Sequence, residues 1–433
     1  MAYHYATPEE LRLGMYVHLE GGWLAHPFPL SKFKITSPEQ VATLRALGLE
    51  KIRWNPEKSD PPAIKPTPVA IVGSAVRRGE SEGPTWPQSA PAQVSEQPAQ
   101  QQRLAQLTAQ RQALKLCERQ FAEATSECKT LMSLVPTQPE AAREHSEALA
   151  RALVSKMLEQ GEVCIRLLTE AAGDHATLHP VNVSVISLLL GKALGMSETE
   201  MLDLGVGAVL HDVGKLDQPE RVHHLADYFS ASEIKYYQQH VELGVAHARK
   251  MGLSPGAAQV IAQHHEHVDG SGFPNRLQSD SITLASRIVS LVNQYDNLCN
   301  PSVPSKAMTP HEALALLFAQ GKRKFDATIL GGFIKMMGVY PPGSVVQLTD
   351  NRYAMVVSIN SSRPLKPSVL VYERGVPRDE ALVLSLETVP GLGVLRSIKP
   401  MALPREAYEY LSPRPRTAYF FERAQPLETE TMS

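Results

Sequence analysis

The chain has 433 residues, of which 43% are hydrophobic and 20% charged, and its formal net charge is −2. This length favours two or three domains over a single core. The nearly neutral net charge gives no indication of a surface for a nucleic acid polymer. The four cysteines show no CxxC spacing, which is typical of reduced thiols. Since neither a secretory leader nor a span-length apolar stretch is visible in the sequence, we expect a cytoplasmic protein.

The first 60 residues have the pattern of a small α/β domain. Apolar residues alternate in 15–19 and 51–54, as in strands, and Ser37-Pro38 marks the start of a helix that continues to Leu47. Residues 61–102 are rich in Pro, Ser, Gln and Ala. Such a segment buries little apolar surface, so it is predicted to be a flexible linker.

Residues 103–172 are predicted to form a helical hairpin. Apolar side chains recur at helical spacing from Leu104 to Phe121. Pro136 and Pro139 interrupt the pattern, and a second helix is expected over about 140–171. The two helices either pack on each other or form the contact of a homodimer.

The rest of the chain changes from helical to strand periodicity. Residues 173–338 are predicted to be helical almost throughout, with Pro180 at a helix start and Gly195 and Gly252 at helix ends. Residues 339–400 are predicted to be a small β domain with strands at 344–348, 353–357 and 369–372, and 401–433 a loose tail. The expected fold class is therefore mainly α, an all-helical domain flanked by a small α/β and a small β domain.

Histidines gather in the helical domain. Ten of the fifteen lie between His175 and His267. Imidazole and carboxylate groups together favour a transition-metal site. Because adjacent helical residues point about 100° apart, one member of a His-His or His-Asp pair can face one ion and its neighbour another. Two ions can clamp the oxygens of a phosphoryl group. The candidate ligands are His179, His211, Asp212, His240, His264 and His265.

These residues stand in recognisable motifs. They are His211-Asp212-Val213-Gly214-Lys215, a His240 segment, and a stretch from His264-His265-Glu266 to Gly272-Phe273-Pro274. In this order they resemble the HD-GYP group of HD-superfamily phosphohydrolases, which hydrolyse the bacterial second messenger cyclic di-GMP. The start of the chain also resembles the small domain often found ahead of HD-GYP domains.

The resemblance implies a set of roles. It implies an all-helical, metal-dependent domain with two divalent ions, Fe or Mn. The six candidates above match ligand positions, and Asp212 also belongs to the catalytic machinery. Lys215 matches the lysine that meets the substrate phosphate, while Gly272, Phe273 and Pro274 stand where the family has a substrate-binding Gly-Tyr-Pro.

Two departures from the family pattern lie after the ligand histidines. Asn293 stands where an aspartate ligand is usual, and its uncharged amide should weaken the hold on one ion. For Asp296, one turn later, a surface or capping role is expected rather than ligation. The family's basic stretch is replaced by Ser302-Val303-Pro304-Ser305.

His175 matches the place of a third-metal ligand, but a helix starting near His179 would leave it in a loop. His223, His224, His247 and His267 are expected to be surface residues.

The function expected from these motifs is metal-dependent hydrolysis of cyclic di-GMP in bacterial signal transduction. Two alternatives stay open. A degenerate domain would bind cyclic di-GMP, or a protein partner such as a diguanylate cyclase, without turnover. A metal phosphohydrolase could also act on another nucleotide. The metal content of the protein distinguishes the enzyme from the docking module, since a docking module need not retain two ions.

Overall fold

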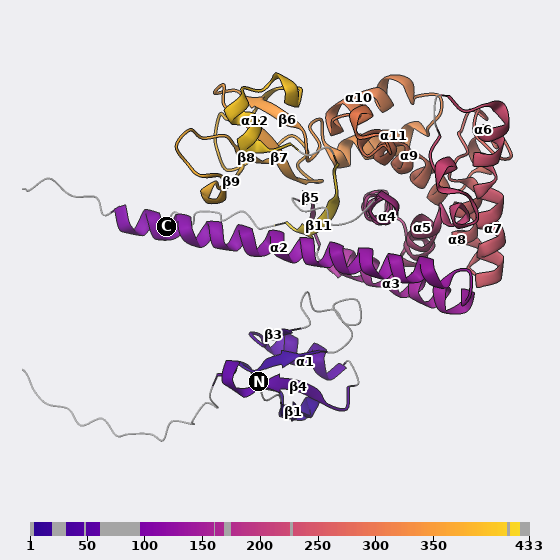
Figure 1. The fold of residues 1–433 in the computed structure, drawn as a ribbon. Coiled ribbons are helices and arrows are strands. Elements are labelled where there is room, and N and C mark those ends of the chain that lie inside the picture. Colours follow the sequence, from indigo (N-terminus) through magenta and orange to yellow (C-terminus); the bar gives the residue numbers. More distant parts are fainter. Residues whose placement is uncertain are drawn as a thin grey trace, which may run out of the picture. The chain divides into compact units, whose positions relative to one another are not determined.

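A computed structural model of the chain describes residues 4–19, 32–46, 49–60, 96–159, 161–168, 175–225, 228–413 and 416–424. The chain divides into two compact units, with the boundary at Ala105 and Gln106. Each is described by itself (Figure 1). The expected linker over 61–102 lies outside the described residues except at its end, where helix α2 already begins at Glu96.

The N-terminal unit is a four-stranded antiparallel sheet with one helix. The sheet order is β1-β4-β2-β3, and Val17 of β2 faces Trp54 of β4. Val17, Ile35, Leu44 and Ile52 are buried and form its core. The sequence predicted the central strands and the helix, but not the two outer strands. The elements are β1 (His4–Ala6), η1 (Pro8–Glu10), β2 (Tyr16–His18), β3 (Lys32–Lys34), α1 (Pro38–Ala46), β4 (Ile52–Asn55) and η3 (Pro56–Lys58).

Two helices lead into the second unit, α2 (Glu96–Leu134) and α3 (Pro139–Glu159). Both contribute to the main apolar core, and α3 packs on α5. The predicted extension of α3 to residue 171 is wrong, because the chain forms strand β5 (Val163–Leu167) after Glu159. The alternation of buried Val163 and Ile165 with half-buried Cys164 is a strand pattern too short to stand out beside a long helix.

The helical domain is built around α4, which is buried on nearly every side from Val181 to Leu190. A helix that is apolar all round becomes the centre of a helical domain. Pro180 lies inside α4 rather than at its start. Gly252 ends α7 in the left-handed conformation, with φ of 68°. The domain comprises α4 (His175–Ala193), α5 (Glu198–Leu210), η4 (Val213–Asp217), η5 (Glu220–Val222), α6 (Ala231–Gln238), α7 (His240–Met251), α8 (Pro255–Gln263), η6 (Ser279–Ser281), α9 (Leu284–Cys299), η7 (Pro304–Lys306), α10 (Pro310–Gln320) and α11 (Ala327–Met337).

The C-terminal sheet draws on more of the chain than predicted. Five of its seven strands follow the order β10-β6-β7-β5-β11, while β8 pairs with β7 and β9 pairs with β8. The three predicted strands are present, but β5 and β11 come from outside 339–400, so those limits are too narrow. The elements are β6 (Val345–Leu348), β7 (Tyr353–Asn360), β8 (Ser368–Val371), η8 (Arg378–Glu380), β9 (Val383–Ser385), β10 (Val394–Ser397), η9 (Pro400–Ala402), α12 (Arg405–Leu411) and β11 (Tyr419–Arg423).

The predicted loose tail is also wrong over its described part. Strand β11 pairs antiparallel with β5, and Tyr419, Phe420 and Phe421 are buried. The ring of Phe420 meets Phe121 of α2 edge-to-face at 6.3 Å. The prolines of this segment lie outside the strand, so they do not prevent its pairing.

The expected fold class is confirmed, since the chain is mainly helical with one small sheet near each end (Figure 1). Within the described residues, no helix is both long enough and apolar enough to cross a membrane.

The buried β11 gives a stability prediction. We expect Phe420→Ala to lower the free energy of unfolding by about 3–5 kcal/mol, because it opens a cavity against Phe121. Met401 is 86% exposed, so Met401→Ala should change stability by less than about 0.5 kcal/mol. Urea unfolding of both variants checks this, and equal stabilities would contradict the packing of β11.

Candidate metal centre

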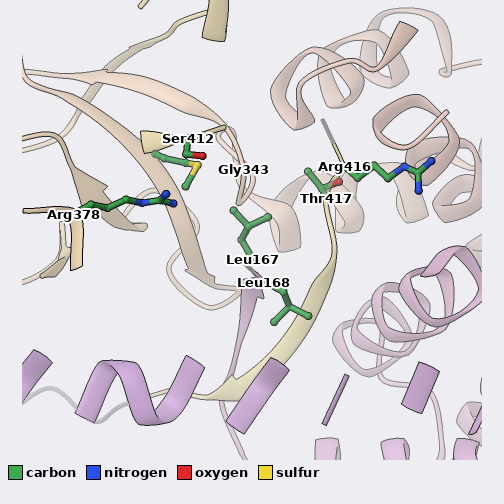
Figure 2. Close-up of a pocket in the computed structure, with 8 residues that line it drawn as sticks. Leu167, Leu168, Gly343, Arg378, Ser412, Arg416 and Thr417 are labelled. Atoms are coloured by element: carbon green, nitrogen blue, oxygen red, sulfur yellow. The ribbon is translucent and has the colours of Figure 1, made fainter. Parts of the chain in front are cut away.

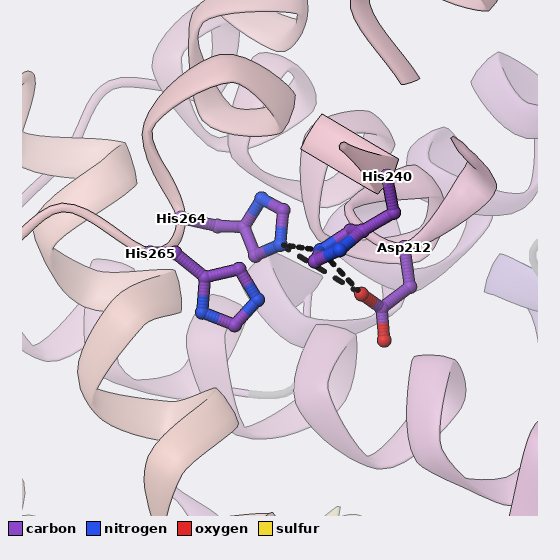
Figure 3. A group of neighbouring side chains, drawn as sticks. All are labelled: Asp212, His240, His264 and His265. Atoms are coloured by element: carbon purple, nitrogen blue, oxygen red, sulfur yellow. Dashed lines mark hydrogen bonds and ion pairs between the residues drawn. The ribbon is translucent and has the colours of Figure 1, made fainter. Parts of the chain in front are cut away.

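The six histidine and aspartate candidates meet in one place. His211 and His264 come directly after the last turns of α5 and α8, and His240, two residues after the end of α6, is the first residue of α7. Helix C-termini carry partial negative charge and unpaired carbonyls, which favour a cation nearby. His179, from α4, and His265 complete the set with Asp212. Figure 3 shows Asp212 with His240, His264 and His265.

Asp212 is shared between two groups of potential ligands. Its Oδ2 lies 3.4 Å from His211 Nε2 and 3.7 Å from His179 Nε2. Its Oδ1 lies 3.5 Å from His240 Nε2 and 3.7 Å from His264 Nε2. One group that could hold an ion is therefore His179, His211 and Asp212, and the other is Asp212, His240, His264 and His265.

His264 and His265 belong to the same group, although the sequence allowed each of them to face a different ion. The carboxylate of Asp212 is what joins the two groups, because its two oxygens face opposite sets of imidazoles. A carboxylate can bind two ions in this way, which an imidazole ring cannot do through one nitrogen.

The second ring nitrogen fixes each tautomer. The Nδ1–H of His211 donates to Ala208 O at 2.7 Å, and that of His264 donates to Ile261 O at 2.8 Å. His240 Nδ1–H donates to Tyr237 O at 2.6 Å. A carbonyl only accepts, so Nδ1 must carry the proton and Nε2 must present a lone pair. Metal-binding histidines are typically held in this manner.

The lone pairs point at one another. The Nε2 atoms of His240 and His264 are 3.3 Å apart, and those of His179 and His211 are 3.2 Å apart. The buried Oδ1 of Asp212 makes no hydrogen bond within the described part of the chain. Facing lone pairs beside an unsatisfied carboxylate oxygen are unfavourable without a cation between them. The donor set therefore fits metal ions.

Burial keeps these groups in their ligating forms. It lowers the pKa of His240 to about 3 and that of His265 well below its usual value. Burial alone would raise the pKa of Asp212, but the Lys215 ammonium holds that pKa well below its usual range. Neutral imidazoles and an ionised carboxylate are the forms that bind metal.

Lys215 lies beside the shared carboxylate. Its Nζ donates to Asp212 Oδ2 at 2.6 Å and lies 5.7 Å from the ring centre of Tyr237. Lys215 does not continue α5, which ends at Leu210, but belongs to the tighter helix η4. The lysine is nevertheless within reach of the site.

Two glycines allow the backbone to close around the ligands. A Cβ on Gly214 would lie 1.9 Å from His240 O, and one on Gly272 would lie 2.5 Å from His265 O. Phe273 then stacks on His265, with ring centres 4.4 Å apart and planes inclined by 20°. The Gly272-Phe273-Pro274 segment thus orients a potential ligand, whatever it contacts in a substrate.

Glu266 holds the same loop from inside. Its buried carboxylate accepts from Asn275 N–H at 2.7 Å and from Leu277 N–H at 2.9 Å. Sequence reasoning quoted Glu266 only as part of a motif. Its position directly after two adjacent histidines marked it as a candidate for a role in the site. A buried glutamate needs hydrogen-bond donors, and here the backbone of the loop supplies them.

Asn293 and Asp296 differ from expectation. Asn293 is buried on α9, and its amide oxygen accepts from Asn297 Nδ2 at 2.7 Å, so this oxygen is engaged within the helix. The expected surface role for Asp296 is wrong, because Asp296 is fully buried and its Oδ2 accepts from His179 Nδ1–H at 2.6 Å. Asp296 therefore orients a potential ligand, as the carbonyls do for the other histidines.

The remaining histidines divide into several environments. His175 is the first residue of α4, so its expected loop position is wrong. His247 is buried against Asp217 at 2.9 Å, which contradicts its expected surface position. His223, His224 and His267 are half-buried. None of these three, nor His247, belongs to either group of potential ligands among the described residues.

Comparison with known families agrees with this geometry. An HD domain matches residues 141–329, and a domain of unknown function, DUF3391, matches residues 7–146. The helical part of the chain is therefore similar to an HD domain. A relative over most of its length is the cyclic di-GMP phosphodiesterase PA4108 of Pseudomonas aeruginosa, 26% identical over 84% of this chain and 83% of the relative.

Other relatives match a smaller share of the chain. The cyclic di-GMP phosphodiesterase PdeB of Borreliella burgdorferi is 23% identical over 52% of this chain, which spans 59% of that relative's length. A 3′3′-cGAMP-specific phosphodiesterase of Vibrio cholerae is 32% identical over 37% of this chain and 31% of its own. Among solved structures, the HDGYP protein Bd1817 of Bdellovibrio bacteriovorus has a TM-score of 0.41 and 14% identity, covering 77% of this chain and 98% of its own.

Gly214 provides a test of the site's assembly. We expect Gly214→Ala to destabilise the helical domain by about 1–3 kcal/mol and to reduce bound metal, because the new methyl group forces η4 away from His240. In Gly331→Ala the methyl meets no atom within 4 Å, so this helical substitution should stabilise by about 0.5–1 kcal/mol. Urea unfolding and elemental analysis measure both effects, and full metal content in Gly214→Ala would refute the close approach.

Proposed function

We propose that this protein is a metal-dependent phosphodiesterase that hydrolyses cyclic di-GMP. The observation that carries the proposal is the pair of imidazole groups on either side of Asp212. A pair of adjacent divalent ions is suited to phosphoester hydrolysis, because together they can neutralise the attacking and leaving oxygens.

Each candidate ligand has a proposed place. His179 and His211 would hold one ion, and His240, His264 and His265 would hold the other, with Asp212 between them. Imidazole nitrogen with carboxylate oxygen suits Fe or Mn. When bound, such ions supply Lewis-acid activation of the phosphodiester and of water.

The protein's own groups would bind and orient the substrate. Lys215 carries a cation beside Asp212, and we assign it to a non-bridging phosphate oxygen of the substrate, where it offsets developing negative charge. Phe273, stacked on His265, offers an apolar ring edge beside the site. Gly272 and Pro274 hold that ring in place, and through it they contribute to substrate binding.

The choice of cyclic di-GMP rests on the relatives. Those named for cyclic di-GMP include PA4108, which matches most of this chain, while the 3′3′-cGAMP-specific relative matches a shorter part. Both substrates are cyclic dinucleotides, so the chemistry at the phosphate is common to them. A domain that only binds the nucleotide or a protein partner such as a diguanylate cyclase is the alternative, and it would not require two complete ligand groups.

The test combines metal content with turnover. Protein purified without chelators is expected to carry Fe or Mn, and Asp212→Ala should remove most of it because both groups lose their shared carboxylate. Chromatography should show cyclic di-GMP converted to the linear dinucleotide or GMP by the wild-type protein, with 3′3′-cGAMP as the competing substrate. A wild-type protein that binds neither Fe nor Mn after reconstitution would refute the enzyme.

Asn293 gives a directional prediction. Asn293→Asp should increase metal occupancy and turnover at limiting Mn, because it adds negative charge on the face of α9 that carries Asp296. Gln294→Glu adds the same charge on the exposed face of α9 and serves as the matched control. Equal gains in the two variants would point to a general charge effect, and no gain in Asn293→Asp would remove position 293 from the ligand set.

A further inference from the structure

A hydrogen-bonded clamp joins the C-terminal segment to the metal centre. Asn182 Nδ2 donates to Thr417 O at 2.9 Å and to Asp296 Oδ1 at 3.0 Å. Asn300 Nδ2 donates to the same two oxygens, at 2.9 Å and 2.8 Å. Two asparagines from different helices therefore bridge one backbone carbonyl and one carboxylate oxygen. We call Asn182, Asn300, Asp296 and Thr417 the asparagine clamp.

Backbone donors set the direction of both amides. Thr417 N–H donates to Asn300 Oδ1 at 2.7 Å, and Tyr419 N–H donates to Asn182 Oδ1 at 3.1 Å. A backbone N–H cannot accept, so each amide must turn its oxygen toward the C-terminal segment and its NH₂ group toward Asp296. The course of residues 417–419 thus decides where the amide protons point.

Asp296 passes this arrangement to His179. Its side chain is fully buried, and two amide donors occupy Oδ1. The other oxygen, Oδ2, accepts from His179 Nδ1–H at 2.6 Å. A buried carboxylate must be satisfied by several donors, and here one of them is the imidazole whose Nε2 faces His211 and Asp212. Asp296 thus accepts the Nδ1–H of His179, as helix carbonyls accept the Nδ1–H groups of His211, His240 and His264.

The clamp lies where the sheet meets the helical domain. Thr417 precedes β11, the strand that pairs with β5 and buries Tyr419. It also lines a pocket together with Leu167 and Leu168 at the end of β5, and Gly343 before β6 (Figure 2). The C-terminal sheet is thus tied through hydrogen bonds to a ligand that is more than two hundred residues earlier in the sequence.

We propose that the C-terminal segment at Thr417–Tyr419 positions His179 for metal binding through Asn182, Asn300 and Asp296. The inference rests on the proposed metal site and adds positioning residues from outside the ligand set. The C-terminal sheet then contributes to the metal centre. A change at residues 417–419 weakens the binding of one ion more than that of the other.

The test measures Mn²⁺ binding to the full-length, chelator-treated protein by calorimetry and elemental analysis. Asn300→Ala removes one of the two amide groups that donate to Asp296 Oδ1, and Asp296→Asn removes the charge that His179 meets. Each is expected to weaken the binding of one Mn²⁺ by about 10-fold or more, the effect typical of lost outer partners of a metal ligand. The second ion, on the side of His240 and His264, should bind nearly as in the wild type.

A double variant and a control separate positioning from general damage. Because both substitutions act through His179, Asp296→Asn with Asn300→Ala should weaken binding no more than the stronger single change. Ser184→Ala removes a buried hydrogen bond, to Pro180 O, on the same helix as Asn182 and should leave both affinities unchanged. Fully additive losses, or an equal loss in Ser184→Ala, would overturn the clamp.

The outcomes distinguish this inference from the proposed function. Wild-type protein that binds no Mn²⁺ overturns the proposed function and the clamp with it. Normal binding by the wild type, with unchanged affinity in folded Asn300→Ala and Asp296→Asn, overturns the clamp alone.

A measurement on the metal-free wild-type protein covers the case in which these variants do not fold. Nitrogen-15 NMR of labelled histidines, with His179 assigned by loss of its signals in His179→Gln, reports which ring nitrogen carries the proton. The clamp requires the Nδ1–H form. A predominant Nε2–H form of His179 would overturn it.

Discussion

The arrangement of the site depends on one electrostatic constraint. Buried imidazoles whose Nδ1–H groups are already donated leave Nε2 lone pairs directed at each other and at Asp212. In a low-dielectric interior such facing lone pairs and an unsatisfied carboxylate oxygen cost free energy until a cation lies between them. The buried groups therefore favour positive charge between them. Lys215 supplies part of this charge, and divalent ions would supply more.

Carbonyls at three helix ends hold the imidazoles in this arrangement. His211, His240 and His264 each donate to the carbonyl three residues earlier, in the last turn of α5, α6 and α8. At these helix ends the imidazole donates to a carbonyl and has its own tautomer fixed. The C-termini of α5, α6 and α8 bring partial negative charge to the same site, while His240 is itself the first residue of α7. Gly214 permits this convergence because only a residue without a Cβ fits against His240 O.

Local sequence patterns predicted the features of the site that depend on residues close together in the chain. The clustering of histidines, the His211-Asp212 pair and the long helical run identified the helical domain and its ligand candidates. The same reasoning missed Asp296, because its partner His179 lies 117 residues earlier, and it missed Asn182, whose contact with Thr417 spans 235 residues. Strands β5 and β11 were missed for the same reason, since each is short and finds its pairing partner far along the chain.

Asn293 gives the clamp its significance in this chain. An aspartate at that position would bring a full negative charge to one ion, whereas the amide brings none and bonds Asn297 instead. The carboxylate nearest His179 is that of Asp296, at 2.6 Å, and it acts through the imidazole rather than on an ion directly. A histidine that donates to a carboxylate is a stronger base at its other nitrogen. The affinity of this ion therefore depends more on how well Asp296 is held, and Asp296 is held by two asparagines anchored to the C-terminal segment.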